Sequence, residues 1–273
     1  MKLARATMWA AAALAAVAFA SARVHAGAWP VPAGGGSASG NPELVFTFDD
    51  GPNRNTERVL QTLRDHHVQA LFFLVGEMLS RGEPGLVNRV MTQMLADGHV
   101  IANHTMTHMQ LCSGTPEAAM AEIVDARATI ERYTGLHADW FRTPYGARCA
   151  RHERMLTELG IAHFHWDIDP QEWKDHSVKR TAEYVLGRAR HLTGRAVVLI
   201  HDIHPVTARA LPLILEGLEA ENAKRRASGA KEIVIVPPSQ IAAERMAPGL
   251  LDWVRETANA AADALAGAGA AIP

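Results

Sequence analysis

The chain has 273 residues, of which 48% are hydrophobic and 21% charged, and its formal net charge at pH 7 is −2. This is the composition of an ordinary globular protein of one domain, or at most two, long enough to bury a full core without disulfides. It contains no long basic block, which argues against nucleic acid as the main partner.

The N-terminus has the order of a secretory signal peptide. Lys2 and Arg5 precede an uncharged apolar run over 8–20, and small residues suited to cleavage follow up to Ala26. The alternative is a membrane anchor, but the run is short for a span of about 20 residues. We therefore predict a signal peptide over 1–26 and export to the periplasm or the medium, with no stable membrane anchor after cleavage. The mature chain would carry 24 basic against 29 acidic residues, because the signal holds three of the 27 Lys and Arg.

A segment rich in Gly, Pro, Ser and Ala predicts a flexible linker over 27–42. After it, apolar runs of strand length alternate with longer helical patterns, which predicts one domain over 43–248. The Ala-rich remainder, 249–273, predicts one more helix over 250–266 and a frayed end.

The alternation can be followed in chain order. Strands are predicted at Leu44–Phe48, Ala70–Val75, His99–Ala102, Asp139–Arg142, Ala162–Trp166, Ala196–Ile200 and Ile233–Val236. Helices are predicted at Thr56–Asp65, Gly85–Asp97, Pro116–Thr134, Arg151–Leu159, Val178–Leu192 and Pro205–Ala227. Strands that alternate with helices run parallel and are joined by right-handed crossovers. The prediction is an α/β fold, a distorted seven-stranded (β/α) barrel, with a doubly wound open sheet as the alternative.

Unusual polar clusters follow the carboxyl ends of five of these strands. They occupy 47–52, 103–108, 142–146, 166–173 and 199–202. In a parallel α/β barrel those ends meet at one rim, and that rim carries the active site. The sequence therefore predicts that the five clusters converge.

His104 and His108 are four residues apart, a spacing that puts two imidazoles on one face of a helical turn, where they could bind one cation. An isolated pair of this kind is more often a polar helix surface, so a third ligand is needed. An Asp on the same rim would supply it and leave a coordination position open, as in catalytic zinc sites.

Asp49 and Asp50 are adjacent at the end of an apolar strand. Two neighbouring carboxylates repel, so the pair is costly unless a cation or hydrogen bonds offset it. Neighbouring strand residues point to opposite faces, but a bend at Gly51-Pro52 lets one Asp bind a metal while the other faces the reacting water. The alternative is a turn cap ahead of Gly-Pro.

Two further groups of residues have less specific interpretations. Cys112 and Cys149 could form a disulfide after export, or stay as two buried thiols, because spacing alone cannot show that they meet. Metal binding is disfavoured, since neither has a partner at ligand spacing. His163 and His165 fall within a predicted strand and are interpreted as residues that line or cap the barrel.

Together the motifs resemble the polysaccharide deacetylase family, whose members share the NodB homology domain (carbohydrate esterase family 4). The resemblance covers about 44–241 and includes five motifs in the family's order, and the sequence TFDDGP at 47–52 matches the family's first motif without change. It implies a metal-dependent hydrolase that removes N-acetyl groups from peptidoglycan, a chitin-like polymer or an exported polysaccharide and releases acetate.

The resemblance also implies roles for the central residues. Asp50, His104 and His108 would hold the metal, most often zinc in this family, with cobalt or nickel sometimes accepted. Asp49 would be the base that takes a proton from the attacking water. His201 would be the acid that protonates the leaving amine.

Surrounding residues acquire roles in the same way. Arg142 would hold the base in place, and the Tyr145 backbone N–H would help to bind the oxyanion. Trp173 and Leu199 would form the pocket walls that receive the acetyl methyl group.

One position departs from the family. The family commonly has Asp-x-x-Asp-Trp at its fourth motif, where this chain has DPQEW at 169–173. Glu172 keeps the carboxylate but adds a methylene. The local geometry must therefore adjust by the length of a C–C bond if Glu172 tethers Arg142 or His201.

Two other functions stay open at this point. An O-acetyl esterase acting on a xylan-type polymer would use nearly the same chemistry. A non-catalytic carbohydrate-binding protein could keep the fold, although the complete set of base, acid and metal ligands argues against it. The oligomeric state is not determined by the sequence.

Overall fold

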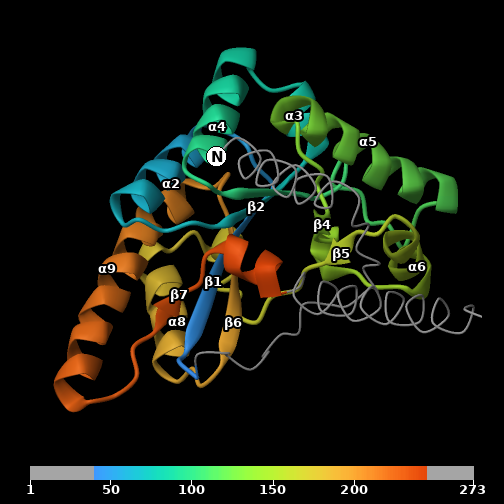
Figure 1. Ribbon diagram of the computed structural model, residues 1–273. Helices are drawn as coiled ribbons and strands as arrows, with labels where there is room; N and C mark the ends of the chain where they lie inside the picture. The colour runs from blue at the N-terminus through green and yellow to red at the C-terminus, as the bar shows by residue number, and fades with distance from the viewer. Residues whose placement is uncertain (1–39, 245–273) are drawn as a thin grey trace, which may run out of the picture. The chain divides into compact units, whose positions relative to one another are not determined.

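The structure, a computed structural model, describes residues 40–244 (Figure 1). The predicted signal peptide, all but the last residues of the linker and the predicted helix over 250–266 lie outside the described residues. Within 40–244, no helix is both long and apolar enough to cross a bilayer.

Seven parallel strands form one sheet in the described part of the chain. They are β1 (Glu43–Asp49), β2 (Leu71–Leu74), β3 (Val100–Asn103), β4 (Trp140–Phe141), β5 (Ala162–His163), β6 (Arg195–His201) and β7 (Val234–Ile235). The order is β5-β4-β3-β2-β1-β6, with β7 paired to β1. The segment after β5 then pairs with β6, through a parallel bridge between Ile168 and Val198. This pairing curls the sheet toward closure, so the distorted barrel is confirmed and the open doubly wound sheet is wrong.

The central strand β1 fixes the register of the sheet. β6 runs beside it along its whole length, from Glu43 opposite Arg195 to Asp49 opposite His201. On the other edge, β7 pairs with the start of β1 and β2 with its end. Two polar residues that are 152 positions apart in the sequence, Asp49 and His201, therefore end neighbouring strands at the same level.

All six helices predicted within residues 40–244 are present. They are α2 (Arg54–Asp65), α4 (Pro84–Ala96), α5 (Pro116–Thr134), α6 (Ala150–Glu158), α8 (Val178–Arg190) and α9 (Pro205–Ser228). The sequence did not predict the short helices α3 (Gly76–Ser80) and α7 (Glu172–Asp175), or the 3-10 turn Pro144–Gly146. Segments of three to five residues are too short for a helical period to be visible in the sequence.

Side-chain alternation along β1 decides what enters the barrel. Phe46 and Phe48 belong to the apolar cluster between the sheet and its helices, whereas Val45 packs with Phe73, Phe164 and others in a separate cluster inside. Because successive strand residues face opposite sides, Thr47 and Asp49 point inward like Val45. At the carboxyl end of β1, the Asp49 side chain therefore points into the barrel.

Candidate active site

A cavity of about 290 Å³ lies at the carboxyl ends of the strands. It is lined by Asp49, Asp50, His104, His108, Thr143, Tyr145, Trp166, Asp169, Trp173, Leu199, His201 and His204. All of them except His204 belong to the five polar clusters singled out in the sequence, and every cluster contributes at least one. The structure therefore brings the clusters together at one rim.

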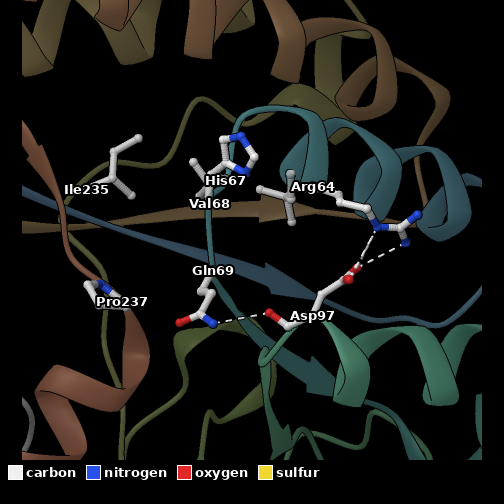
Figure 2. Close-up of a pocket in the computed structure, with 8 residues that line it drawn as sticks. Arg64, His67, Val68, Gln69, Asp97, Ile235 and Pro237 are labelled. Atoms are coloured by element: carbon white, nitrogen blue, oxygen red, sulfur yellow. Dashed lines mark hydrogen bonds and ion pairs between the residues drawn. The ribbon is translucent and has the colours of Figure 1, made fainter.

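A larger cavity, of about 450 Å³, lies where β2 begins and β7 ends (Figure 2). Its two charged residues, Arg64 and Asp97, already pair with each other, because Arg64 Nη2 lies 3.1 Å from Asp97 Oδ2. Gln69 Nε2 donates to the Asp97 backbone carbonyl at 3.2 Å. None of the five polar clusters contributes to it. The smaller cavity is therefore the candidate active site.

Asp49 is 2% exposed and has one carboxylate oxygen fixed. Arg142 Nη1 donates to Asp49 Oδ1 and to Thr47 Oγ1, at 2.7 Å in each case. The fully buried guanidinium also donates to the carbonyl of Phe164 at 3.2 Å and stacks over the ring of Phe73, 4.2 Å from its centroid. Asp49 Oδ2 is left on the side of His104, whose Nε2 lies 3.7 Å away.

Asp50 turns out of the strand in the left-handed region, with φ 76°. Its Oδ1 lies 3.4 Å from His104 Nε2 and 3.2 Å from His108 Nε2. Burial raises the pKa of Asp50, but the two imidazoles lower it further, to well below its usual range. The next residue must be Gly51 for steric reasons, because a Cβ there would lie 2.4 Å from Asp202 Oδ2.

His104 and His108 lie in a loop after β3, so the predicted helical turn is wrong. Thr105 and His108 have φ values of 70° and 61°, which interrupt any helix. The loop is held instead by the Thr105 N–H, which donates to Asn103 Oδ1 at 2.8 Å, and by the Gly76 N–H, which donates to the Thr105 carbonyl at 3.0 Å. The ring centroids of His104 and His108 still lie only 5.0 Å apart, although the backbone between them is not helical.

Asp50, His104 and His108 each offer a ligand atom, and these atoms lie within 4.8 Å of one another. His104 Nδ1 lies 2.7 Å from the Arg142 carbonyl and His108 Nδ1 3.2 Å from the Tyr145 hydroxyl, so both rings have the outer nitrogen engaged and Nε2 turned to Asp50. Such outer contacts orient imidazoles for metal binding. Asp50 Oδ1 is buried and finds no hydrogen-bond donor in the described part of the chain. One carboxylate and two imidazoles placed in this way fit a divalent transition ion.

His201 is held by Glu172. Glu172 is fully buried at the start of α7, and its Oε1 lies 2.9 Å from His201 Nδ1. Burial lowers the pKa of His201, but the hydrogen bond and negative charge of Glu172, aided by Asp49 and Asp50, raise it to about 9. The sequence left open whether Glu172 tethers Arg142 or His201, and in the structure it contacts His201.

The remaining expected residues form the walls of the cavity. Leu199 is buried, whereas Tyr145 and Trp173 are 70% and 46% exposed at its edge. Tyr145 lies in the 3-10 turn with φ 61°. A non-glycine residue there is strained, and such strain gathers at functional sites.

Sequence reasoning did not single out two acidic residues near the cavity. Asp169 lines it, and burial raises the pKa of Asp169. Asp202 is fully buried, accepts a hydrogen bond from the Thr56 hydroxyl, and has a pKa raised by burial to about 7. Both lie inside polar clusters noted in the sequence, so their position in those clusters could have indicated that they lie near the active site.

Cys112 and Cys149 form a disulfide, with their Cα atoms 5.9 Å apart. Cys112 follows His108 by four residues, and Cys149 follows Tyr145 by four. The bond therefore joins the two segments whose His108 and Tyr145 side chains meet at the cavity.

Comparison with known proteins gives a consistent result. Residues 36–164 match the family model described as polysaccharide deacetylase. A chitooligosaccharide deacetylase of Bradyrhizobium sp. (strain ANU 289) is 36% identical over 172 residues, which cover 62% of this chain and 75% of that protein.

Longer relatives and solved structures are also similar. The peptidoglycan-N-acetylglucosamine deacetylase PgdA of Listeria monocytogenes is 33% identical over 185 residues, or 67% of this chain, and the chain spans 37% of the length of that relative. The solved structure of a T48 deacetylase with substrate has a TM-score of 0.64 and 27% identity, over 76% of this chain and 93% of the other.

Proposed function

Because the chain belongs to the polysaccharide deacetylase family, we propose that it is a hydrolase that removes N-acetyl groups from an N-acetylated polysaccharide or oligosaccharide and releases acetate. The observation that carries the proposal is that Asp49, Asp50, His104, His108 and His201 line one cavity. Relatives named as chitooligosaccharide and peptidoglycan-N-acetylglucosamine deacetylases support N-acetyl sugars as the substrate class.

Asp50, His104 and His108 are assigned to hold one divalent ion. The ligand set favours zinc, with cobalt or nickel as substitutes. When bound, such an ion polarises a carbonyl oxygen and lowers the pKa of water. The chain's own contribution is to orient both imidazoles through Arg142 and Tyr145.

Asp49 is the proposed general base. Arg142 holds its Oδ1, so Oδ2 accepts the proton of the attacking water. The Asp49 side chain points into the barrel, and the buried guanidinium of Arg142 holds its Oδ1. The carboxylate is therefore positioned before substrate binds. A base positioned in this way contributes roughly 10²–10⁴-fold to the rate.

His201 is the proposed general acid. Its Nδ1–H donates to Glu172, so Nε2 carries the proton that passes to the leaving nitrogen. A pKa of about 9 keeps the imidazole protonated at neutral pH, as an acid requires. Base and acid thus stand on the ends of adjacent strands, Asp49 opposite His201.

The walls of the cavity complete the proposal. The Tyr145 backbone N–H is assigned to the developing oxyanion, since fixed donors aimed at that charge stabilise the transition state. Trp173 and Leu199 are assigned to the acetyl methyl group. The exposed rings of Tyr145 and Trp173 offer apolar faces to a sugar.

Export is part of the same proposal. The charged, apolar and small-residue order of residues 1–26 supports a cleaved signal, and a peptidoglycan-acting relative supports an extracytoplasmic substrate. The N-terminal sequence of the protein recovered from the periplasm or medium tests this, with a new terminus near residue 27 expected.

Acetate release from a panel of polymers tests the function. Protein freed of metal and reloaded with zinc is incubated with chitooligosaccharides, peptidoglycan and acetylated xylan. Acetate together with new free amines is expected from the N-acetyl substrates. Acetate from xylan alone would indicate an O-acetyl esterase, and binding without acetate would indicate a non-catalytic carbohydrate-binding protein.

A further inference from the structure

His204 lines the active-site cavity but has no part in the proposed mechanism. It is the N-cap residue of α9, three residues after the proposed acid His201. Its side chain makes no capping hydrogen bond to the helix. Within residues 40–244, neither ring nitrogen of His204 has a hydrogen-bond partner, and neither is buried. A half-buried imidazole with two free nitrogens at a substrate cavity is available to bind a ligand.

Hydrogen bonds fix the backbone around His204. Its N–H donates to the His201 carbonyl at 3.3 Å, and its own carbonyl accepts an N–H from the first turn of α9 at 3.1 Å. The carbonyl of the preceding Ile203 accepts from the side-chain amides of Asn53 and Asn55, at 2.9 and 2.8 Å. The place of His204 beside His201 is therefore set before substrate binds, which limits the entropy lost on binding.

His204 differs from His201 in charge. Glu172 holds His201 and keeps it protonated, whereas His204 forms no ion pair in the part of the chain that the structure describes. Burial and the positive charge of His201 lower the pKa of His204. Its ring is therefore neutral at neutral pH, and one nitrogen donates a hydrogen bond while the other accepts one. Such a ring suits a hydroxyl group, which also both donates and accepts.

The distance between the two histidines suits one sugar. The ring centroids of His201 and His204 lie 6.0 Å apart, so hydrogen bonds of about 2.9 Å from both rings reach two polar atoms that lie close together on one molecule. The leaving nitrogen and a hydroxyl oxygen of the same amino sugar meet this condition. We propose that His204 is a substrate-binding residue that hydrogen-bonds a hydroxyl group of the sugar whose acetamide nitrogen faces His201. This role rests on the proposed function and complements the apolar faces that Tyr145 and Trp173 offer to a sugar.

Kinetics of zinc-loaded protein with N-acetylchitotetraose test this role. His204→Ala should raise KM by about 5- to 20-fold and change kcat by less than about 3-fold, because a contact made equally in the bound substrate and the transition state affects binding alone. His204→Gln keeps a donor and an acceptor and should recover part of the loss. His176→Ala is the matched control, because the exposed His176 ring lies 6.1 Å from that of His204 but does not line the cavity; its KM should equal that of the wild type. Acetohydroxamate, a metal-binding inhibitor without a sugar hydroxyl, should inhibit the wild type and every variant equally.

An unchanged KM in His204→Ala would overturn this role. A rise in the inhibition constant of acetohydroxamate that matches the rise in KM would do the same, because the substitution would then have disturbed the whole cavity. Calorimetric titration of N-acetylchitotetraose into Asp49→Asn, with and without His204→Ala, makes the comparison without turnover. A Kd weaker by about 5- to 20-fold in the double variant supports the role even if the wild type releases no acetate, a result that counts against the deacetylase function alone. Equal Kd values overturn the role of His204 whether or not acetate is released, and no acetate with no binding overturns both.

Discussion

Glu172 holds His201 at two points with one oxygen. Its Oε1 lies 2.9 Å from the imidazole Nδ1 and accepts the His201 backbone N–H at 2.7 Å. This geometry answers the question raised by the longer side chain at a position where the family commonly has Asp. The extra methylene lets a residue on α7 reach both the ring and the backbone at the end of β6.

Glu172→Gln should lower the pKa of His201. Burial lowers that pKa and Glu172 raises it to about 9, so removal of the carboxylate charge leaves burial dominant. A general acid must be protonated, so the alkaline limb of kcat/KM, expected near pH 9 in the wild type, should move to lower pH. At about pH 8 the rate should fall by about 10-fold or more. Glu172→Asp keeps the charge but shortens the side chain, so its limb should move less than that of Glu172→Gln. An unmoved limb in Glu172→Gln would contradict the assignment.

Asp49→Asn should abolish most activity and spare metal binding. The substitution removes the proposed base but none of the proposed ligands, so the loss in kcat should be at least about 10²-fold. Zinc content and kcat are measured on the same preparation. Near-normal turnover would mean that the base lies elsewhere.

His108→Ala should lose zinc and activity together, because two ligands remain where three stood. His67→Ala is the control, because His67 lines the larger cavity and not the active site, and this variant should retain both zinc and activity. Chelation of the wild type should reproduce the loss, and added zinc should reverse it. Full zinc occupancy in His108→Ala would overturn the triad.

Cys112→Ser/Cys149→Ser should lower both stability and metal affinity. Closing a loop with a sequence separation of 37 residues restricts the unfolded chain, which corresponds to about 4 kcal/mol in the free energy of unfolding. The same bond joins the segments of His108 and Tyr145, so zinc affinity should weaken as well. Urea unfolding and zinc titration, each with and without reductant, measure the two effects. A variant as stable as the oxidised wild type would contradict the first, and unchanged zinc affinity the second.

Asp202→Asn should change how stability depends on pH. Burial raises the pKa of Asp202 from 3.8 to about 7. Below about pH 4 the carboxyl is protonated in both folded and unfolded states. As pH rises toward 7, the Asp202 carboxyl ionises only in the unfolded state. The wild type therefore loses stability over this range, and the Asp202→Asn variant does not. The difference in Tm between metal-free variant and wild type should therefore grow from about pH 4 to 7 and stay level above. A constant difference across that range would show that Asp202 ionises normally.

The order of elements could be predicted because it depends on local patterns. Seven apolar runs alternate with longer periodic segments, and each run became a strand. The polar clusters after these runs indicated the rim, since parallel strands place their carboxyl ends together. The short α3 and α7 lie below the length at which a period can be recognised.

The sequence by itself therefore determined the parallel α/β fold and the set of residues that meet at its rim. Only the tertiary structure decided how they meet. Register between β1 and β6 sets Asp49 opposite His201, and loop hydrogen bonds rather than a helical turn bring His104 toward His108. The physical reason is that periodicity acts over a few residues, whereas these contacts join segments that only packing and strand register place side by side.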